Sequence, residues 1–210
     1  FHTLRAYYDP TKHQGKSRNY PLGYGSDVIV TDLFDCLRGD QGNTFAPLVE
    51  AEQHMVSFVC AAAPDLKSYH ARFVPEVLRQ QMRNVIYAGL LNKLQRIHSA
   101  QAPWQNHVMH DSVLILGAWG CGAFGNDPWV IAPMFAEILA GIMMEVRNNP
   151  GLMSIWYKEI HFALPVMQPD DLDNPEAFRL PLLRLAEAIG TNLRYYHSDG
   201  RKITLLPLPW

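Results

Sequence analysis

The stretch GAWGCGAFGND, residues 117–127, stands between the apolar run VLIL at residues 113–116 and a segment that begins with Pro128. The apolar run predicts a strand, and Asp127 followed by Pro128 predicts the start of a helix. A glycine-rich loop therefore joins a strand to a helix N-terminus. Glycines let the backbone approach phosphate oxygens, and the free N–H groups and the dipole of a helix N-terminus favour negative charge. The stretch thus predicts a site for a diphosphate.

Hydrophobic periodicity extends the prediction to the whole chain. Apolar residues recur every three or four positions over residues 75–98 and 128–147, which predicts two long helices, and a last helix is expected over about 177–189. We expect strands at residues 28–31, 55–61, 113–116, 159–164 and, at an edge, 202–206. We expect loops at residues 1–26, 36–47, 99–111 and 168–176.

Strands that alternate with long helices predict an α/β fold with a mixed, largely parallel sheet. Binding sites in such folds lie at the carboxyl ends of strands. The small-residue loops 61–65 and 117–126 both follow predicted strands, so we expect them to form the site together.

Composition excludes several classes of protein. The 210 residues are 48% hydrophobic and 18% charged, which predicts one globular domain over residues 1–210. A net charge of −2 argues against DNA binding, although Lys12, Lys16 and Arg18 form a local basic group that can contact an anion. We find no stretch that approaches the roughly 20 apolar residues of a membrane span, and no signal peptide. The chain does not begin with Met, so we expect it to be processed or a fragment.

The three cysteines, Cys36, Cys60 and Cys121, are odd in number and far apart. They argue against a disulfide framework and a four-cysteine zinc site, and we expect an intracellular setting, cytoplasmic or nuclear. We interpret the histidines of one polar stretch as a solvated loop rather than a metal site: His98, His107 and His110. No metal or other cofactor is expected.

The loop contains GCGAFG, residues 120–125, which is a literal GxGxxG. An NAD-dependent oxidoreductase needs this motif after the first strand and an acidic residue about 20 positions later, at a strand end. Here the loop lies in the second half of the chain, and Glu137 and Glu145 fall inside a predicted helix. The oxidoreductase is therefore a distant alternative. A plain tight turn is also a weak explanation, because a turn does not need four glycines in nine residues.

The sequence LGAWGCGAFGND closely resembles the diphosphate loop of poly(ADP-ribose) glycohydrolases, in the form typical of the microbial type. Other segments are similar to that family in the same order. They are GYGSDVIV (residues 23–30), LRGDQG (37–42), VSFVCAAAPD (56–65) and HFALPV (161–166), so the likeness covers about residues 7–180. The family resemblance implies a macrodomain fold, a three-layer α/β/α sandwich that binds ADP-ribose.

The resemblance also implies roles for individual residues. It implies that backbone N–H groups wrap the diphosphate and the distal ribose along one binding loop: Gly117, Gly120, Cys121, Gly122, Ala123 and Gly125. Asn126, which follows them, is also expected to bind the ligand. Phe124 would press on the ribose whose bond is cut. A second group of ligand-binding residues is implied after the earlier strand: Ala62, Ala63, Pro64 and Asp65, where Asp65 stands in place of the family's Asn. From the residues themselves we expect Trp119 to be a packing residue, Cys121 not to be a nucleophile because no His accompanies it, and Asp127 to be an N-cap.

Besides Asp65, the sequence departs from the family in its catalytic segment. The family cleaves the ribose–ribose bond with adjacent glutamates, in a GGG segment followed by Gln-Glu-Glu, and this sequence contains neither. Its only adjacent acidic pair, Asp170 and Asp171, does not match. The glutamates would fall upstream of Phe1, with a further strand of the sheet.

Two explanations stay open. In the first, the chain is the C-terminal part of a glycohydrolase that hydrolyses ribose–ribose O-glycosidic bonds in poly(ADP-ribose). An N-terminal polypeptide segment then completes the sheet and supplies the catalytic glutamates. In the second, the chain is a macrodomain that binds ADP-ribose without hydrolysing it, a reader module.

Overall fold

The structure, a computed structural model, describes residues 28–30, 34–36, 38–41, 44–50, 53–67, 72–98, 113–164, 173–190, 195–196 and 202–203. The predicted loops 1–26 and 99–111 lie outside these residues. So do several residues that the sequence singled out: Lys12, Lys16, Arg18, His107, His110, Asp170 and Asp171. The described helices are α3 (Pro75–His98), α5 (Pro128–Arg147), α6 (Pro150–Ile155) and α7 (Asp173–Ile189). Helices α3 and α5 have the predicted bounds.

The strands form five described pairs, and they confirm a mixed α/β fold. Strand β7 (Val113–Gly117) pairs in parallel with β8 (Glu159–Ala163). Four pairs are antiparallel: β1 (Val28–Val30) with β6 (Val59–Ala61), β2 (Phe34–Cys36) with β5 (His54–Val56), β3 (Arg38–Gln41) with β4 (Thr44–Pro47), and β9 (Tyr195–Tyr196) with β10 (Lys202–Ile203). The parallel pair is the one that carries the glycine loop, because Gly117 is both the last residue of β7 and the first of the loop.

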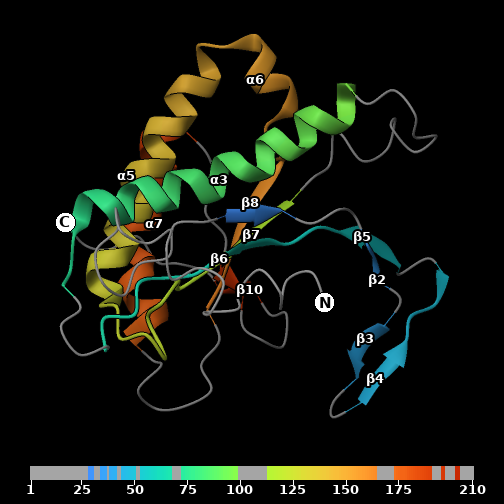
Figure 1. Ribbon diagram of the computed structural model, residues 1–210, viewed down its shortest axis with the longest axis horizontal. Coiled ribbons are helices and arrows are strands. Elements are labelled where there is room, and N and C mark those ends of the chain that lie inside the picture. The colour runs from blue at the N-terminus through green and yellow to red at the C-terminus, as the bar shows by residue number, and fades with distance from the viewer. Residues whose placement is uncertain are drawn as a thin grey trace, which may run out of the picture.

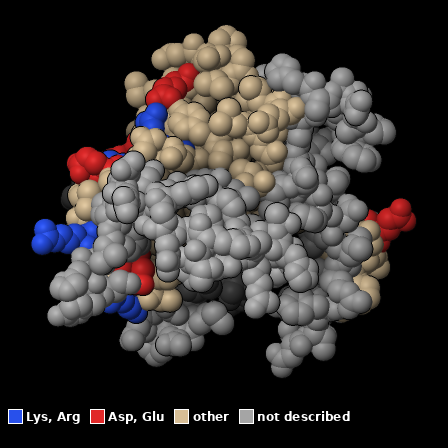
Figure 2. Space-filling model, viewed as in Figure 1, with Lys and Arg blue, Asp and Glu red and all other residues tan. Residues whose placement is uncertain are grey.

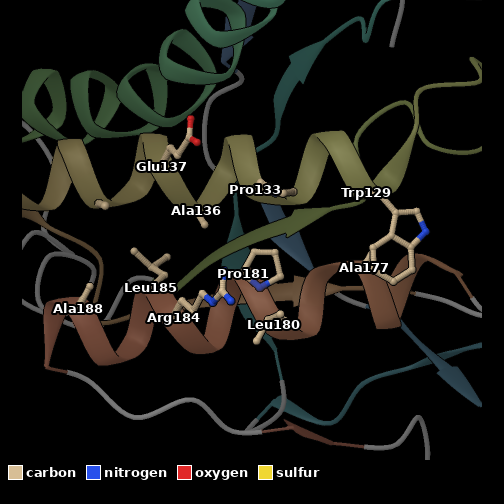
Figure 3. Close-up of a pocket in the computed structure, with 11 residues that line it drawn as sticks. Trp129, Pro133, Ala136, Glu137, Ala177, Leu180, Pro181, Arg184, Leu185 and Ala188 are labelled. Atoms are coloured by element: carbon tan, nitrogen blue, oxygen red, sulfur yellow. The ribbon is translucent and has the colours of Figure 1, made fainter. Parts of the chain in front are cut away.

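Helices α3, α5 and α7 share one hydrophobic core with the inner face of β7. Leu114 and Leu116 of β7 are buried in this core, and Phe162 of β8 meets Phe135 of α5 and Phe178 of α7 at ring-centroid distances of 5.6 and 5.4 Å. Helix α3 crosses α5 (Figure 1), and α5 and α7 lie side by side in front of β7 (Figure 3). The core therefore fixes the direction in which β7 delivers the glycine loop.

The outer face of β7 is open. Val113 and Ile115 alternate with the buried leucines and are 43% and 68% exposed. Parallel strands are normally covered on both faces, and an unbroken apolar run such as Val113–Leu116 is typical of that environment. The described residues thus cover only one of the two faces that the strand's composition predicts to be buried.

Helix α5 corrects one expectation. Among the described residues it is the one helix that is long and apolar enough, by length and composition, to cross a membrane. The statement that no stretch approaches a membrane span was therefore wrong. The apolar residues that set its period lie in the core: Ile131, Phe135, Ile138, Leu139, Ile142 and Val146 are all buried. A buried core helix passes the same test, so its composition is explained by packing.

The strand predicted over residues 55–61 is two strands. Strands β5 and β6 are separated by Ser57 and Phe58, and their partners β2 and β1 are separated by residues 31–33. The prediction failed because a single apolar run does not report a change of pairing partner.

Three further boundaries differ from the prediction. Residues 36–47, predicted as turns, contain the β3–β4 hairpin, which projects away from the helices (Figure 1). The short helix α6, which was not predicted, is capped by Asn149, whose side chain accepts hydrogen bonds from the N–H groups of Gly151 and Leu152. Helix α7 begins at Asp173, four residues before the predicted start, which shortens the predicted acidic loop.

Gly89 of α3 makes room for Tyr157, whose hydroxyl donates to the Ile86 carbonyl at 3.4 Å. A methyl group at residue 89 would collide with that hydroxyl. We expect Gly89→Ala to lower the free energy of unfolding by about 1–3 kcal/mol, because the buried ring must shift. Alanine would otherwise be favoured over glycine in a helix by about 1 kcal/mol. Urea denaturation measures the change.

The control uses Tyr157→Phe, in which the colliding oxygen is absent and the nearest ring carbon is 3.4 Å from the added methyl group. In that background Gly89→Ala should be neutral or stabilising. An increase in stability on Gly89→Ala alone would contradict the packing described for Tyr157.

Candidate functional site

The glycine loop is built from short turns. The N–H of Cys121 donates to the Ala118 carbonyl at 3.0 Å, and the N–H of Gly125 donates to the Gly122 carbonyl at 3.1 Å. Gly120 and Gly125 have φ values of +80° and +68°, a conformation that other residues rarely adopt. These two glycines are therefore required by the backbone itself, whereas Gly122 is not.

Three consecutive N–H groups on the loop are available to a ligand. Within the described part of the chain, those of Gly122, Ala123 and Phe124 donate no hydrogen bond, and all three residues are exposed. A side chain added at Gly122 would meet nothing within 4 Å. Successive unpaired N–H groups form a concave donor surface that suits an anion. The arrangement fits the sequence prediction for Gly122 and Ala123.

The loop is tied to the loop that follows β6. The N–H of Leu66 donates to the Phe124 carbonyl at 2.9 Å, and Trp119 Nε1 donates to the Ala61 carbonyl at 3.1 Å. Asn126 Nδ2 donates to the Pro64 carbonyl at 2.7 Å. The two strand-end loops therefore meet, as their positions in the sequence predicted. Sequence reasoning missed Leu66, because a backbone donor leaves no mark on residue type.

The residues predicted after β6 lie partly beneath the glycine loop. Ala63 and Pro64 are buried, and the Cβ of Ala63 lies where a side chain at Gly120 would need to be. Asp65 Oδ1 accepts a hydrogen bond from the N–H of Lys67 at 3.2 Å. Ala63 and Pro64 are thus buried next to the glycine loop. Ligand contact by Ala62 and Asp65 stays a prediction.

Two aromatic residues of the loop have different environments. Phe124 is 41% exposed, so it is not a core residue and its ring is accessible beside the free N–H groups. Trp119 is half-buried and packs against the hydrophobic core, in addition to its bond to Ala61. The expectation that Trp119 is a packing residue agrees with this position.

Charged groups near the loop are few. Asp127 caps α5, and its side chain accepts from the N–H of Trp129 at 2.9 Å, as predicted. The methylene groups of the Lys67 side chain lie over Gly125, which brings a cation to the edge of the loop. Burial, and secondarily the negative charge of Asp127, raises the pKa of the Cys121 thiol to about 12.

No group of three His, Cys, Asp or Glu side chains that could hold a metal ion is found in the described ranges. Two ion pairs join helices α3 and α5: Arg83 with Glu145 at 2.9 Å and Arg79 with Glu137 at 3.4 Å. On the left of the face in Figure 2, described acidic and basic side chains lie near one another.

A groove of about 440 Å³ lies between α5 and α7 (Figure 3). Its lining is mostly apolar, with Trp129 at one end and Glu137 and Arg184 as the charged residues. None of the residues predicted to bind a ligand lines it. The groove and the glycine loop are therefore separate features, and the chemistry predicted from the sequence belongs to the loop.

The raised pKa of Cys121 predicts low reactivity. Because burial disfavours the thiolate, only about one thiol in 10⁴ is ionised at pH 8, and the thiolate is the reactive form. We expect iodoacetamide to modify Cys121 at least about 100-fold more slowly in the folded protein than in urea. Mass spectrometry of the peptide that contains Cys121 measures both rates. Equal rates in the two states would contradict the burial of the thiol.

No protein-family model and no curated protein matches the chain. Among solved structures, the chain is similar to poly(ADP-ribose) glycohydrolase from Thermomonospora curvata, with 26% identity over 73% of this chain and 46% of that one, and a TM-score of 0.43. It is also similar to the Deinococcus radiodurans enzyme in complex with ADP-ribose, with 26% identity over 75% and 53% of the two chains and a TM-score of 0.41. The chain spans about half the length of these proteins. They belong to the family that the glycine loop and its flanking segments resemble in sequence.

Proposed function

We propose that the chain binds ADP-ribose through the glycine loop and supplies the diphosphate and distal-ribose part of the site of a poly(ADP-ribose) glycohydrolase. The observation that carries the proposal is the set of unpaired, exposed N–H groups of Gly122, Ala123 and Phe124. They follow a parallel strand and precede the N-terminus of α5, which is where anions bind in α/β folds. The choice of ligand rests on the resemblance of the glycine loop, in sequence, to the diphosphate loop of poly(ADP-ribose) glycohydrolases.

The loop offers counterparts for two parts of ADP-ribose, the diphosphate and one ribose. The N–H groups suit the diphosphate oxygens, and the ammonium group of Lys67 adds positive charge at the edge near Gly125. The exposed ring of Phe124 offers an apolar surface on which a ribose can rest. Oxidoreductase chemistry with NAD has less support, because the acidic residues expected at a strand end lie within α5.

Hydrolysis needs a carboxylic acid that this loop does not offer. The two carboxylates on the described loops are engaged, Asp65 with the N–H of Lys67 and Asp127 with the N–H of Trp129. Cleavage of a glycosidic bond requires a group that protonates the leaving oxygen and stabilisation of a positively charged ribose. We therefore propose that the catalytic glutamates lie on an N-terminal polypeptide segment.

The open face of β7 supports the same proposal. Val113 and Ile115 are exposed on a strand whose composition is typical of burial on both faces. A further segment packed on this face would supply the second covering layer that the strand's composition predicts. The second candidate function, a reader that binds ADP-ribose without hydrolysis, is favoured by one observation: the donor surface of the loop is formed by this chain alone.

Replacing Gly122 tests where the diphosphate binds. A side chain at this position points into open space, so Gly122→Leu should keep the stability within about 0.5 kcal/mol. It should also block the approach of the diphosphate and weaken ADP-ribose binding by at least about 100-fold, which is about 2.7 kcal/mol. Calorimetric titration with ADP-ribose measures the affinity, and NAD is the comparison ligand.

Gly141→Ala, on α5, is the control, because a methyl group there lies 4.0 Å from its closest neighbour outside the α5 backbone, Arg83. It should bind as the wild type does. Undiminished affinity of Gly122→Leu would refute the placement of the diphosphate on this loop.

Enzyme and reader are separated by two measurements on the purified protein. If an N-terminal segment completes the site, intact-mass analysis should show a second polypeptide beside the 23.8 kDa chain, and the sample should release ADP-ribose from the polymer. A lone 23.8 kDa species that unfolds cooperatively, binds ADP-ribose and releases none would contradict the glycohydrolase and favour the reader.

A further inference from the structure

Asn126 is the most deeply buried polar residue of the glycine loop, with 2% of its surface exposed. Its Nδ2 donates to the Pro64 carbonyl at 2.7 Å and to the Gly120 carbonyl at 3.0 Å. Its backbone N–H also donates to the Gly120 carbonyl at 3.0 Å. One carboxamide therefore connects the loop after β6 to the turn that begins the glycine loop.

The surroundings of Asn126 are tight on the side of Gly120. A Cβ at Gly120 would collide with Asn126 Nδ2 and would lie 2.8 Å from the Cβ of Ala63. The missing side chain of Gly120 thus leaves the space that the carboxamide occupies. This gives Gly120 a second requirement besides its positive φ, and it makes the two residues a matched pair.

Packing alone does not account for an amide at this place. Asn126 Oδ1 is buried and has no hydrogen-bond partner among the described residues. An unpaired buried oxygen destabilises a folded protein, so a residue chosen only to fill the space would be apolar. What an apolar residue lacks is the pair of donors that faces the carbonyls of Pro64 and Gly120.

We infer that Asn126 is a positioning residue for the ligand site. Its side chain lies beneath the loop and fixes the distance between the two strand-end loops. By this means it holds the N–H groups of Gly122, Ala123 and Phe124 in the geometry that receives the diphosphate. The inference rests on the proposed function and deepens it, because the carboxamide acts through the loop and does not itself touch the ligand.

The test is Asn126→Asp, which keeps the shape of the side chain and replaces the donor with an oxygen. At about pH 8 the carboxylate faces two carbonyl oxygens, and the loops should separate. We expect the dissociation constant for ADP-ribose to rise by at least about 30-fold. At about pH 5.5 the protonated carboxyl can donate to the Pro64 carbonyl, so the ratio of variant to wild-type dissociation constants should fall towards a few-fold.

Asn149→Asp is the matched control. Asn149 caps α6 through its Oδ1, and an aspartate accepts the same hydrogen bonds from Gly151 and Leu152. The ratio of the Asn149→Asp to the wild-type dissociation constant for ADP-ribose should stay near one at both pH values. A purely structural role for Asn126 would lower the melting temperature and leave the affinity of the folded protein unchanged at either pH. A ratio within twofold of one for Asn126→Asp at about pH 8 would overturn the inference, while wild-type binding would still uphold the proposed function.

Hydrogen exchange of the ligand-free protein gives a reading that does not depend on ADP-ribose. The N–H of Leu66 bonds to the Phe124 carbonyl across the two loops, so its protection reports their contact. It should fall in Asn126→Asp and in Asn126→Leu, while the amides of α5 keep theirs. Unchanged protection of Leu66 would overturn the inference even if the wild type proved not to bind ADP-ribose, which would be the failure of the proposed function.

Discussion

The seating of the glycine loop on the loop after β6 is the constraint on which the site depends. Four of the nine residues at 117–125 are glycines, which bury no side chain, so packing of Ala118, Trp119 and Cys121 against the core does not by itself hold the whole loop in one conformation. Hydrogen bonds between the two loops fix its conformation, and their donors are Trp119 Nε1, Asn126 Nδ2 and the Leu66 N–H. Because the bonds come from both loops, the donor surface above them is a property of two strand ends and not of one turn.

The hydrophobic core fixes the two elements between which the glycine loop lies. Strand β7 is held on one side by β8 and on its inner face by α5 and α7, and the loop leaves it at Gly117 without a flexible spacer. Helix α5 restarts regular structure at Pro128, one residue after its cap. The free N–H groups therefore lie between two elements that are held in place. Because the loop is already ordered, it loses less conformational entropy when a ligand binds.

The sequence predicted the elements that depend on local pattern. Helices α3 and α5 and strands β1, β7 and β8 followed from periodicity and from the Asp127–Pro128 cap, because these signals act within a few residues. The break between β5 and β6 was missed because it depends on which distant strand each of them pairs with. The β3–β4 hairpin is local, and it was missed because the turn-forming residues of 36–47 predicted a loop. At the site, the sequence pattern predicted the glycine loop and the N-cap. It did not predict the hydrogen bonds from Leu66 to Phe124 and from Asn126 to Pro64, because each joins residues about 60 positions apart and has no local signature.

The distribution of charge at the loop separates binding from chemistry. A diphosphate is best received by neutral N–H donors, which carry no hydration shell as strong as that of an ion and need no counter-charge. A carboxylate among them would repel the ligand, and here Asp65 and Asp127 are each held by a backbone N–H in their own turn. Under the proposed function, the acid that cleaves the glycosidic bond has to approach the ribose from an element outside the two loops. The exposed outer face of β7 is a surface on which such an element can pack.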